Sequence, residues 1–262
     1  MGGADYPAEL LCAALRSGAS VVTANKVAVA KHYDALHACA RAGGASLAFS
    51  GAVGGGAPIL ELVARLRDGA GVASIQGVMN GTVNFLLGRL EQGSAFDEAL
   101  TEAQLLGFAE ADSSADVDGH DAAHKLSLLV RESFGVSLPA EMIKRQSLRT
   151  VTPADIRAAL GRGEVLKQVG RCRVGADGQV EAQVHIESLP AAHPLAGARD
   201  EENRFVITDA DGEVHEVFGK GAGRWPTAAA VFADVMDLQR ASPGRTRAAL
   251  AVAEAMPLRL SA

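Results

Sequence analysis

The sequence has 262 residues, which is enough for one large domain or two modest domains with a substantial core. Hydrophobic residues make up 48% of it and charged residues 21%, a globular composition that argues against long disordered segments. The net charge of −6 argues against a broad basic surface for nucleic acid or anionic membranes, and no apolar run approaches the ~18 residues of a membrane helix.

The start of the chain and its cysteines indicate the compartment. The first residues, MGGADYPAEL, have neither a basic n-region nor an apolar h-region, so we expect no secretory signal. The three cysteines, Cys12, Cys39 and Cys172, are odd in number and widely spaced. This pattern predicts small buried residues in a reducing compartment, with neither a disulfide nor a zinc ribbon, and hence a cytoplasmic protein.

The first third of the chain alternates helix and strand patterns. Apolar residues at helical spacing predict helices over 7–18 and 26–44, and the β-branched or apolar runs 19–26 and 45–53 predict short strands. Gly54, Gly55, Gly56 and Pro58 then open a further helix that reaches Gly69. The alternation predicts an α/β fold with a parallel sheet.

Further along, residues 72–93 predict a strand, a turn at Asn80–Gly81 and a helix. Ser94 is a plausible N-cap for a helix that ends at Gly107, and the Thr-Pro pair at 152–153 starts another. Residues 165–218 have the texture of strands and turns, and 219–240 form a glycine-rich turn followed by a helix. A low-complexity tail occupies 241–262.

Residues 107–130, GFAEADSSADVDGHDAAHKLSLLV, crowd acids against the start of an apolar helix. The acids are Glu110, Asp112, Asp116, Asp118 and Asp121. Asp121 and Lys125 are four residues apart and share one helix face. The segment alone fits an acidic helix start with an ordinary ion pair, or a lysine that moves a proton beside carboxylates that hold a substrate ammonium.

Two histidines in the same stretch suggest a different chemistry. His120 and His124 lie at i and i+4, as in the H-E-x-x-H zinc helix, but Asp121 stands where the glutamate should be. No clear third ligand is visible. A zinc hydrolase is therefore an alternative, against the simpler interpretation of two partly exposed histidines.

Three loop segments are candidates for binding. GAVGGGAP (51–58) and GKGAG (219–223) match neither G-x-G-x-x-G nor the P-loop, so each is a tight turn or a place where the backbone approaches a ligand. Lys26 follows Asn25 at the end of the strand at 19–26. Strand carboxyl ends are where open α/β sheets bind ligands.

Taken in order, the segments MGGADYPAEL…VVTANK, AVGGGAPIL, GVMNGTVNFLL, AEADSSADVDGHDAAHK, HPLAG…ENRFVI and GKGAGRWPTA resemble the homoserine dehydrogenase family from residue 1 to about 240. The resemblance implies an α/β fold, in which a truncated Rossmann-type nucleotide-binding half accompanies an α+β catalytic and dimerisation domain. Its implied boundaries are 1–50 for the residual NAD(P)-binding half, 51–217 for the catalytic domain, 218–240 for a turn and helix that return to the nucleotide domain, and 241–262 for the tail.

The resemblance implies NAD(P)-dependent interconversion of L-homoserine and L-aspartate 4-semialdehyde, in the aspartate pathway to threonine, methionine and isoleucine. It implies a homodimer that uses NADP or NAD. Lys125 matches the lysine that exchanges the proton on the substrate hydroxyl, and Lys26 matches a second lysine near the nicotinamide. Asp121 and Glu110 match acids that hold the substrate amino group, and Asp116 matches another acid of that pocket.

The remaining implied site residues lie in loops. Asn80, Gly81 and Thr82 match the loop against the substrate pocket, while Gly3 and Gly223 match cofactor-contacting positions. The backbone carbonyls that match a monovalent-cation site, for Na⁺ or K⁺, are those of Val53, Gly55 and Ala57.

The sequence departs from the family at several places. Ser50 stands where many members have the glutamate that completes the cation site, and Ser113 stands where a proline usually follows the acid. Members also carry a glycine-rich fingerprint ahead of the segment that resembles MGG, and these 262 residues do not contain it. We expect a chain that lacks roughly ~90–100 residues of the nucleotide-binding domain, binds NAD(P) poorly and has unpaired sheet edges.

Two consequences and one alternative follow from these departures. The residue that distinguishes NAD from NADP would lie in the missing part of the nucleotide-binding domain. No regulatory extension is expected after residue 262. A non-catalytic dimerising remnant of the family is the alternative function.

Overall fold

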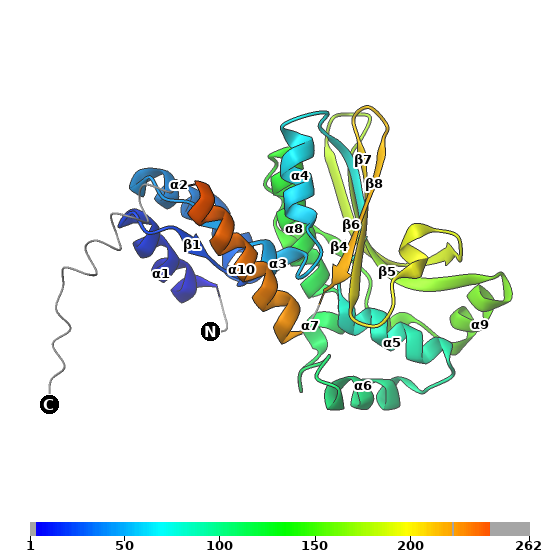
Figure 1. The fold of residues 1–262 in the computed structure, drawn as a ribbon. Coiled ribbons are helices and arrows are strands. Elements are labelled where there is room, and N and C mark those ends of the chain that lie inside the picture. The colour runs from blue at the N-terminus through cyan, green and yellow to red at the C-terminus, as the bar shows by residue number, and fades with distance from the viewer. Residues whose placement is uncertain (1–3, 222, 242–262) are drawn as a thin grey trace, which may run out of the picture.

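The computed structural model describes residues 4–221 and 223–241, which form a small lobe and a large lobe (Figure 1). The small lobe contains α1 (Asp5–Arg16), β1 (Val21–Val22), α2 (Lys26–Gly43) and β2 (Leu47–Ala48), together with α10 (Arg224–Ala241) from the far end of the chain. β1 and β2 pair in parallel, as the alternation predicts. The predicted tail lies outside the described residues from 242 onward.

The strand predicted over 45–53 is wrong in its second half. Residues Ser50–Val53 form the one-turn helix α3, and only Leu47–Ala48 are a strand. The carboxylate of Asp234 on α10 accepts a hydrogen bond of 2.9 Å from the Ser50 amide. This bond satisfies one of the amides that a helix start leaves unpaired, and the sequence around residue 50 gives no sign of it.

Local signals explain the bounds of α2. The side-chain oxygen of Asn25 accepts a hydrogen bond of 3.1 Å from the Ala28 amide, and the helix ends at Gly44 with φ 58°. A Cβ added to Gly43 would lie 1.9 Å from the carbonyl oxygen of Leu15. Glycine at position 43 therefore allows α2 to approach the end of α1 closely.

The cysteines of the small lobe correct a prediction. The structure joins Cys12 on α1 to Cys39 on α2 by a disulfide, with a Cα–Cα distance of 5.4 Å. The two helices pack along each other, and this packing brings together residues that are 27 positions apart. Cys172 is free and buried, as predicted.

The large lobe is built on a six-stranded sheet with the order β4-β6-β5-β3-β7-β8. Its strands are β3 (Val72–Val78), β4 (Lys144–Arg145), β5 (Glu164–Val174), β6 (Val180–Pro190), β7 (Glu202–Asp209) and β8 (Val214–Lys220). β4 is parallel to β6 and the other pairs are antiparallel. The strand-and-turn texture predicted over 165–218 is therefore confirmed.

Helices lie on one face of this sheet and beyond one of its ends (Figure 1). They are α4 (Ile59–Arg67), α5 (Gly81–Glu91), α6 (Phe96–Leu105), α7 (Ser114–Val117), α8 (His120–Phe134) and α9 (Pro153–Gly161), with single turns η1 (Ala140–Met142), η2 (Leu148–Thr150) and η3 (Pro194–Gly197). The Thr-Pro start of α9 is confirmed, because Thr152 and Asp155 cap each other's backbone amides. α6 begins after Ala95 rather than Ser94, since the Glu98 carboxylate accepts from the Ala95 amide.

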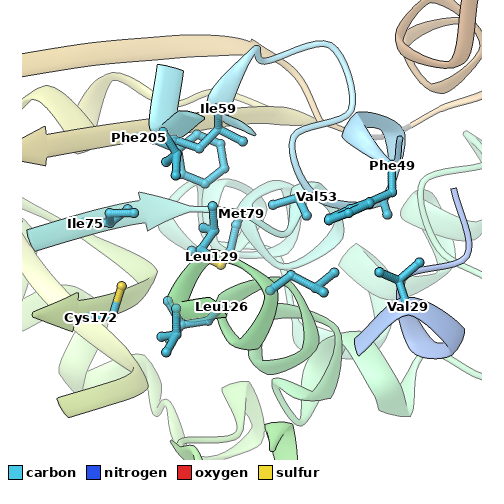
Figure 2. Packing of buried hydrophobic residues seen from close by; sticks show 14 of the residues in the cluster. Val29, Phe49, Val53, Ile59, Ile75, Met79, Leu126, Leu129, Cys172 and Phe205 are labelled. Carbon is cyan, nitrogen blue, oxygen red and sulfur yellow. The ribbon is translucent and has the colours of Figure 1, made fainter. Parts of the chain in front are cut away.

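One face of the sheet carries the main hydrophobic core (Figure 2). Leu126 and Leu129 of α8 pack with Ile75 and Met79 of the β3 region and with Phe205 of β7. These five side chains are at most 1% exposed. Burial of this apolar surface fixes α8 against the sheet, and α8 carries the acidic start predicted to be the site.

Candidate active site

Three segments that are distant in the sequence meet at the first turns of α8. Lys26 begins α2, Asn80 follows β3, and Asp121 and Lys125 lie on α8. The Asn80 side-chain oxygen accepts a hydrogen bond of 2.8 Å from the Val83 amide and so caps α5. Capping fixes the Asn80 amide in the orientation that directs its NH₂ group toward the acids of the site.

Asp121 is the centre of the cluster. One carboxylate oxygen lies 2.9 Å from the Lys26 ammonium, and the other lies 2.9 Å from the Lys125 ammonium. The Asn80 amide donates to the second oxygen at 2.9 Å. Asp121 is 8% exposed, so a buried carboxylate orients two lysines and one amide.

The charges of the site depend on this arrangement. Burial acts to raise the pKa of Asp121, but the ammonium groups of Lys125 and Lys26 outweigh it and hold the pKa below its ordinary value. The negative charge of Asp121 raises the pKa of Lys26. Burial and the neighbouring Asp121 charge raise the pKa of Asp116. The two carboxylates therefore differ: Asp121 stays ionised, while Asp116 takes up a proton more readily.

Lys125 is held from two sides. Its ammonium donates a hydrogen bond of 2.7 Å to the Met79 carbonyl as well as contacting Asp121. The side chain is 12% exposed. A lysine fixed in this way presents one direction for proton exchange with a bound molecule, the arrangement that general acid–base chemistry requires.

The five acids of the opening stretch separate in the structure. Asp116 joins the cluster, since it accepts a hydrogen bond of 2.7 Å from the Asn80 amide. Glu110 is exposed but close enough for its charge to raise the pKa of Lys26. Asp112 accepts from the Ser114 amide, and Asp118 accepts from the Ser147 hydroxyl. Asp116 therefore lies in the cluster and Glu110 near it, whereas Asp112 bonds within its own turn and Asp118 bonds to Ser147, 29 positions later.

The turn after β3 lies beside the cluster. Gly81 and Thr82 are buried at the start of α5. The Thr82 hydroxyl donates to the Phe108 carbonyl at 2.6 Å, which ties this turn to the segment that leads into the acids. A Cβ on Gly81 would lie 2.9 Å from the Cα of Glu201, so another loop covers the turn.

The two glycine-rich segments contact each other. The Gly56 amide donates to the Lys220 carbonyl at 2.9 Å, and a Cβ on Gly55 would lie 2.7 Å from the Gly221 carbonyl oxygen. Gly223 has φ 105°, which favours glycine, and it precedes α10. Val53 and Ala57 are buried in the same region. Gly3 lies outside the described residues.

The histidines do not form a metal site with Asp121. His124 contacts the His120 carbonyl through Nδ1 at 2.8 Å. Within residues 4–221 and 223–241, the group of three or more side chains close enough to share a metal ion is Asp209, Glu213 and His215, on the β7–β8 hairpin. The zinc hydrolase alternative is therefore not supported.

Sequence reasoning missed several neighbours of the site. The Met79 carbonyl, Glu201 and Asn203 were not among the predicted residues. Asn203 is fully buried, and its NH₂ group donates to the Gly54 carbonyl at 3.2 Å. These contacts depend on backbone atoms or on a segment about 120 positions from Asn80, so no local pattern signals them.

Comparison with known proteins defines the class of the chain. The model of an NAD-binding domain, described as "Homoserine dehydrogenase, NAD binding domain", matches residues 1–50. The small lobe therefore contains part of an NAD-binding domain. The model described as "Homoserine dehydrogenase" matches residues 58–236, and the chain belongs to the homoserine dehydrogenase family.

Individual relatives support the same family assignment. Over 246 residues the chain is 39% identical to the homoserine dehydrogenase of Corynebacterium glutamicum, covering 92% of this chain and 55% of that protein. It is 34% identical to an NAD(+)-dependent homoserine dehydrogenase of Pseudomonas canavaninivorans, covering 90% and 67%. A crystal structure of a homoserine dehydrogenase from Thiobacillus denitrificans superposes with a TM-score of 0.86 at 36% identity, covering 92% and 56%.

The chain thus spans about half the length of curated relatives such as the Corynebacterium glutamicum protein. No helix of the described residues is long and apolar enough to cross a membrane.

Proposed function

We propose that this chain carries the substrate side of a homoserine dehydrogenase, which interconverts L-homoserine and L-aspartate 4-semialdehyde with NAD(P). One observation carries the proposal: a buried carboxylate, Asp121, holds two lysine ammonium groups and the Asn80 amide within 2.9 Å. Such a cluster combines proton exchange with recognition of a charged small molecule.

The proton is handled by Lys125. NAD(P), when bound, accepts or supplies the hydride. As homoserine is oxidised, its hydroxyl loses a proton that the Lys125 amine accepts; as the semialdehyde is reduced, the Lys125 ammonium returns a proton to the oxygen. Asp121 and the Met79 carbonyl orient Lys125 for both directions. Lys26, held by the other oxygen of Asp121, keeps a positive charge beside the reacting groups.

Recognition of the amino acid is assigned to the acids that remain available. Glu110 is exposed, and Asp116 uses one carboxylate oxygen to accept from Asn80. We propose that these two carboxylates bind the substrate ammonium, while Asp121 chiefly orients the lysines. The turn Asn80–Thr82 then forms the wall of the pocket.

The cofactor would contact both lobes. Residues 1–50 supply part of the nucleotide-binding domain, 51–217 the catalytic domain and 218–240 the returning turn and helix, and these boundaries stay a proposal. Lys26 and Gly223 would hold NAD(P), and Gly3 is assigned to the same role by resemblance. The left-handed backbone of Gly223 leaves the peptide before α10 open to close approach.

A monovalent cation is a further part of the proposal. The carbonyl groups of Val53, Gly55 and Ala57 would bind it. The fit is supported by Asn203, whose side-chain oxygen is buried and has no partner among the described residues, while its NH₂ group contacts Gly54 in the same loop. Ser50 brings no carboxylate to this loop, so binding by neutral oxygens is expected to be weak.

We also propose a homodimer formed through the face of the sheet opposite the main core. Strand alternation places Gln76, Arg171, Glu216 and Phe218 on this face, where Phe218 is 61% exposed. The charged side chains of Arg171 and Glu216 and the exposed Phe218 can contact the same face of a second copy that is related by a two-fold axis. Multi-angle light scattering should give twice the chain mass, and Phe218→Asp should give monomer. Leu105→Asp, on exposed α6, is the matched control and should stay dimeric.

Turnover tests the enzymatic proposal. The purified chain is mixed with L-homoserine and NAD⁺ or NADP⁺, and formation of the reduced cofactor is followed by absorbance. Lys125→Met should reduce turnover at least about 100-fold, the usual contribution of a positioned proton carrier. Lys31→Met, which removes an exposed lysine paired with Asp5, is the control. A wild-type chain that binds both homoserine and the cofactor but shows no turnover would instead indicate a non-catalytic member of the family. The cytoplasmic location stays a prediction.

A further inference from the structure

A lysine outside the catalytic cluster is buried in the large lobe. Lys167 on β5 is 2% exposed, and its ammonium donates to the side-chain oxygen of Asn84 at 2.7 Å and to the carbonyl of Ala198 at 2.8 Å. Burial lowers its pKa to about 8. Keeping an ammonium in such a place is costly, and its acceptors must compensate for the lost water.

Both acceptors connect Lys167 to the backbone of residues 198–200. Asn84 lies in the first turn of α5, and its NH₂ group donates to the carbonyl of Asp200 at 2.9 Å. Asp200 is the one non-glycine residue with a positive φ in the described part of the chain, at 45°. Lys167 therefore holds the backbone of residues 198–200 directly at Ala198 and through Asn84 at Asp200. We call residues 198–203 the bridging segment.

The bridging segment contacts the loops on both sides of the proposed site. On the substrate side, Glu201 packs against Gly81: a Cβ added to Gly81 would lie only 2.9 Å from the Cα of Glu201. On the cofactor side, the Glu201 carboxylate lies 3.0 Å from the Lys220 ammonium, and its carbonyl accepts from the Gly221 amide at 2.8 Å. The next residue but one, Asn203, donates to the Gly54 carbonyl.

We propose that Lys167 is a positioning residue for the reaction: by holding the bridging segment, it sets the placement of the substrate turn at Gly81 relative to the loop at 219–221. This inference rests on the proposed function for its catalytic meaning, but the contacts stand without it. A methionine at position 167 would fill a similar volume and leave two buried acceptors, on Asn84 and Ala198, without a donor. An unpaired buried acceptor loosens the backbone that it belongs to.

Amide hydrogen exchange tests the proposal on the full chain. In Lys167→Met, exchange at residues 198–203 should accelerate at least about tenfold, because two hydrogen bonds that hold the segment are lost. Exchange at residues 219–221 should also accelerate, although the hydrogen bonds of Lys167 go to Asn84 and Ala198. Exchange in the β5–β6 pairing at 171–174 should change less than about twofold. Lys144→Met, an exposed lysine on β4, is the matched control and should leave all three regions unchanged.

A second variant keeps the test decisive if Lys167→Met does not fold. Glu201→Gln removes the negative charge that pairs with the Lys220 ammonium, so it should accelerate exchange at 219–221 and leave 198–200 protected by Lys167. A uniform rise over the whole lobe in Lys167→Met would overturn the proposal, because it would indicate a general loss of stability. Unchanged protection at 219–221 in both variants would overturn it as well.

Calorimetry with L-homoserine separates this inference from the proposed function. Binding to the wild-type chain that weakens about tenfold in Lys167→Met would support both. No binding to the wild-type chain would contradict the proposed function, while the exchange data would still decide whether Lys167 positions the bridging segment.

Discussion

Replacing Asp121 with asparagine tests the electrostatic centre of the site. The substitution keeps the size of the side chain and an oxygen that can accept from Asn80. It removes the charge that lies 2.9 Å from both Lys26 and Lys125. The two ammonium groups would then lose the counter-charge that both of them contact.

The burial of the two lysines sets the expected loss in the free energy of unfolding. Removing one partner of a buried ion pair costs about 3–5 kcal/mol, because the other charge stays buried and unpaired. The Lys26 side chain is 33% exposed and can turn toward water, whereas Lys125 is 12% exposed. Solvent screening therefore reduces the contribution of Lys26, and we expect the lower end, about 3 kcal/mol at pH 7.

The loss should depend on pH with a defined sign. The folded pKa of Asp121 lies below its ordinary value of 3.8, so its stabilising effect is fully present above that pH. As pH falls below 3.8, the wild type loses the effect by up to about 1.4 kcal/mol per pH unit. The difference between wild type and Asp121→Asn should therefore shrink in acid.

Urea unfolding followed by far-UV circular dichroism measures the stability difference between wild type and Asp121→Asn at pH 7 and at pH 3. Asp116→Asn is the comparator, because burial and the Asp121 charge raise the pKa of Asp116 above 3.8. Its charge opposes folding at neutral pH, so this variant should be at least as stable as wild type at pH 7, with any gain lost in acid. A pH-independent difference for Asp121→Asn, or a loss below about 1 kcal/mol at pH 7, would refute the reasoning.

The remaining predictions concern packing. Gly43→Ala should lower the free energy of unfolding by at least about 2 kcal/mol, because its Cβ would lie 1.9 Å from the Leu15 carbonyl oxygen; Gly88→Ala, in α5 with no atom within 4 Å, should raise it by roughly 0.5–1 kcal/mol. Thermal melting compares them, and equal shifts would contradict this account. Tyr33→Phe removes a hydrogen bond of 2.6 Å to the Glu132 carboxylate and should cost about 1.5 kcal/mol in urea unfolding; an unchanged midpoint would show that the bond is not stabilising.

Local signals in the sequence determined the elements that hold the site. The turn at Asn80–Gly81 and the shared helix face of Asp121 and Lys125 are confirmed, since a cap and an i,i+4 spacing act over a few residues. The resemblance built on these segments is confirmed at the level of the family. The roles of the site residues stay predictions.

Other predictions failed where the deciding contact was distant. The disulfide between Cys12 and Cys39 depends on how α1 packs on α2. The helix at Ser50 depends on a carboxylate from Asp234, 184 residues later. Neither partner lies within the span that periodicity or capping patterns cover.

The acidic stretch separates what the sequence determines from what the tertiary structure determines. The sequence by itself determined that acids crowd the start of an amphipathic helix with a lysine on the same face, because helix geometry fixes which side chains share that face. Only the tertiary structure decided that Asp121 is the buried centre and that Lys26, 95 positions earlier, completes the cluster with Asn80. Packing of α8 on the sheet excludes water from Asp121 but leaves Asp112 exposed. Burial, which the sequence pattern does not specify residue by residue, therefore separates Asp121 from the exposed acids of the same stretch.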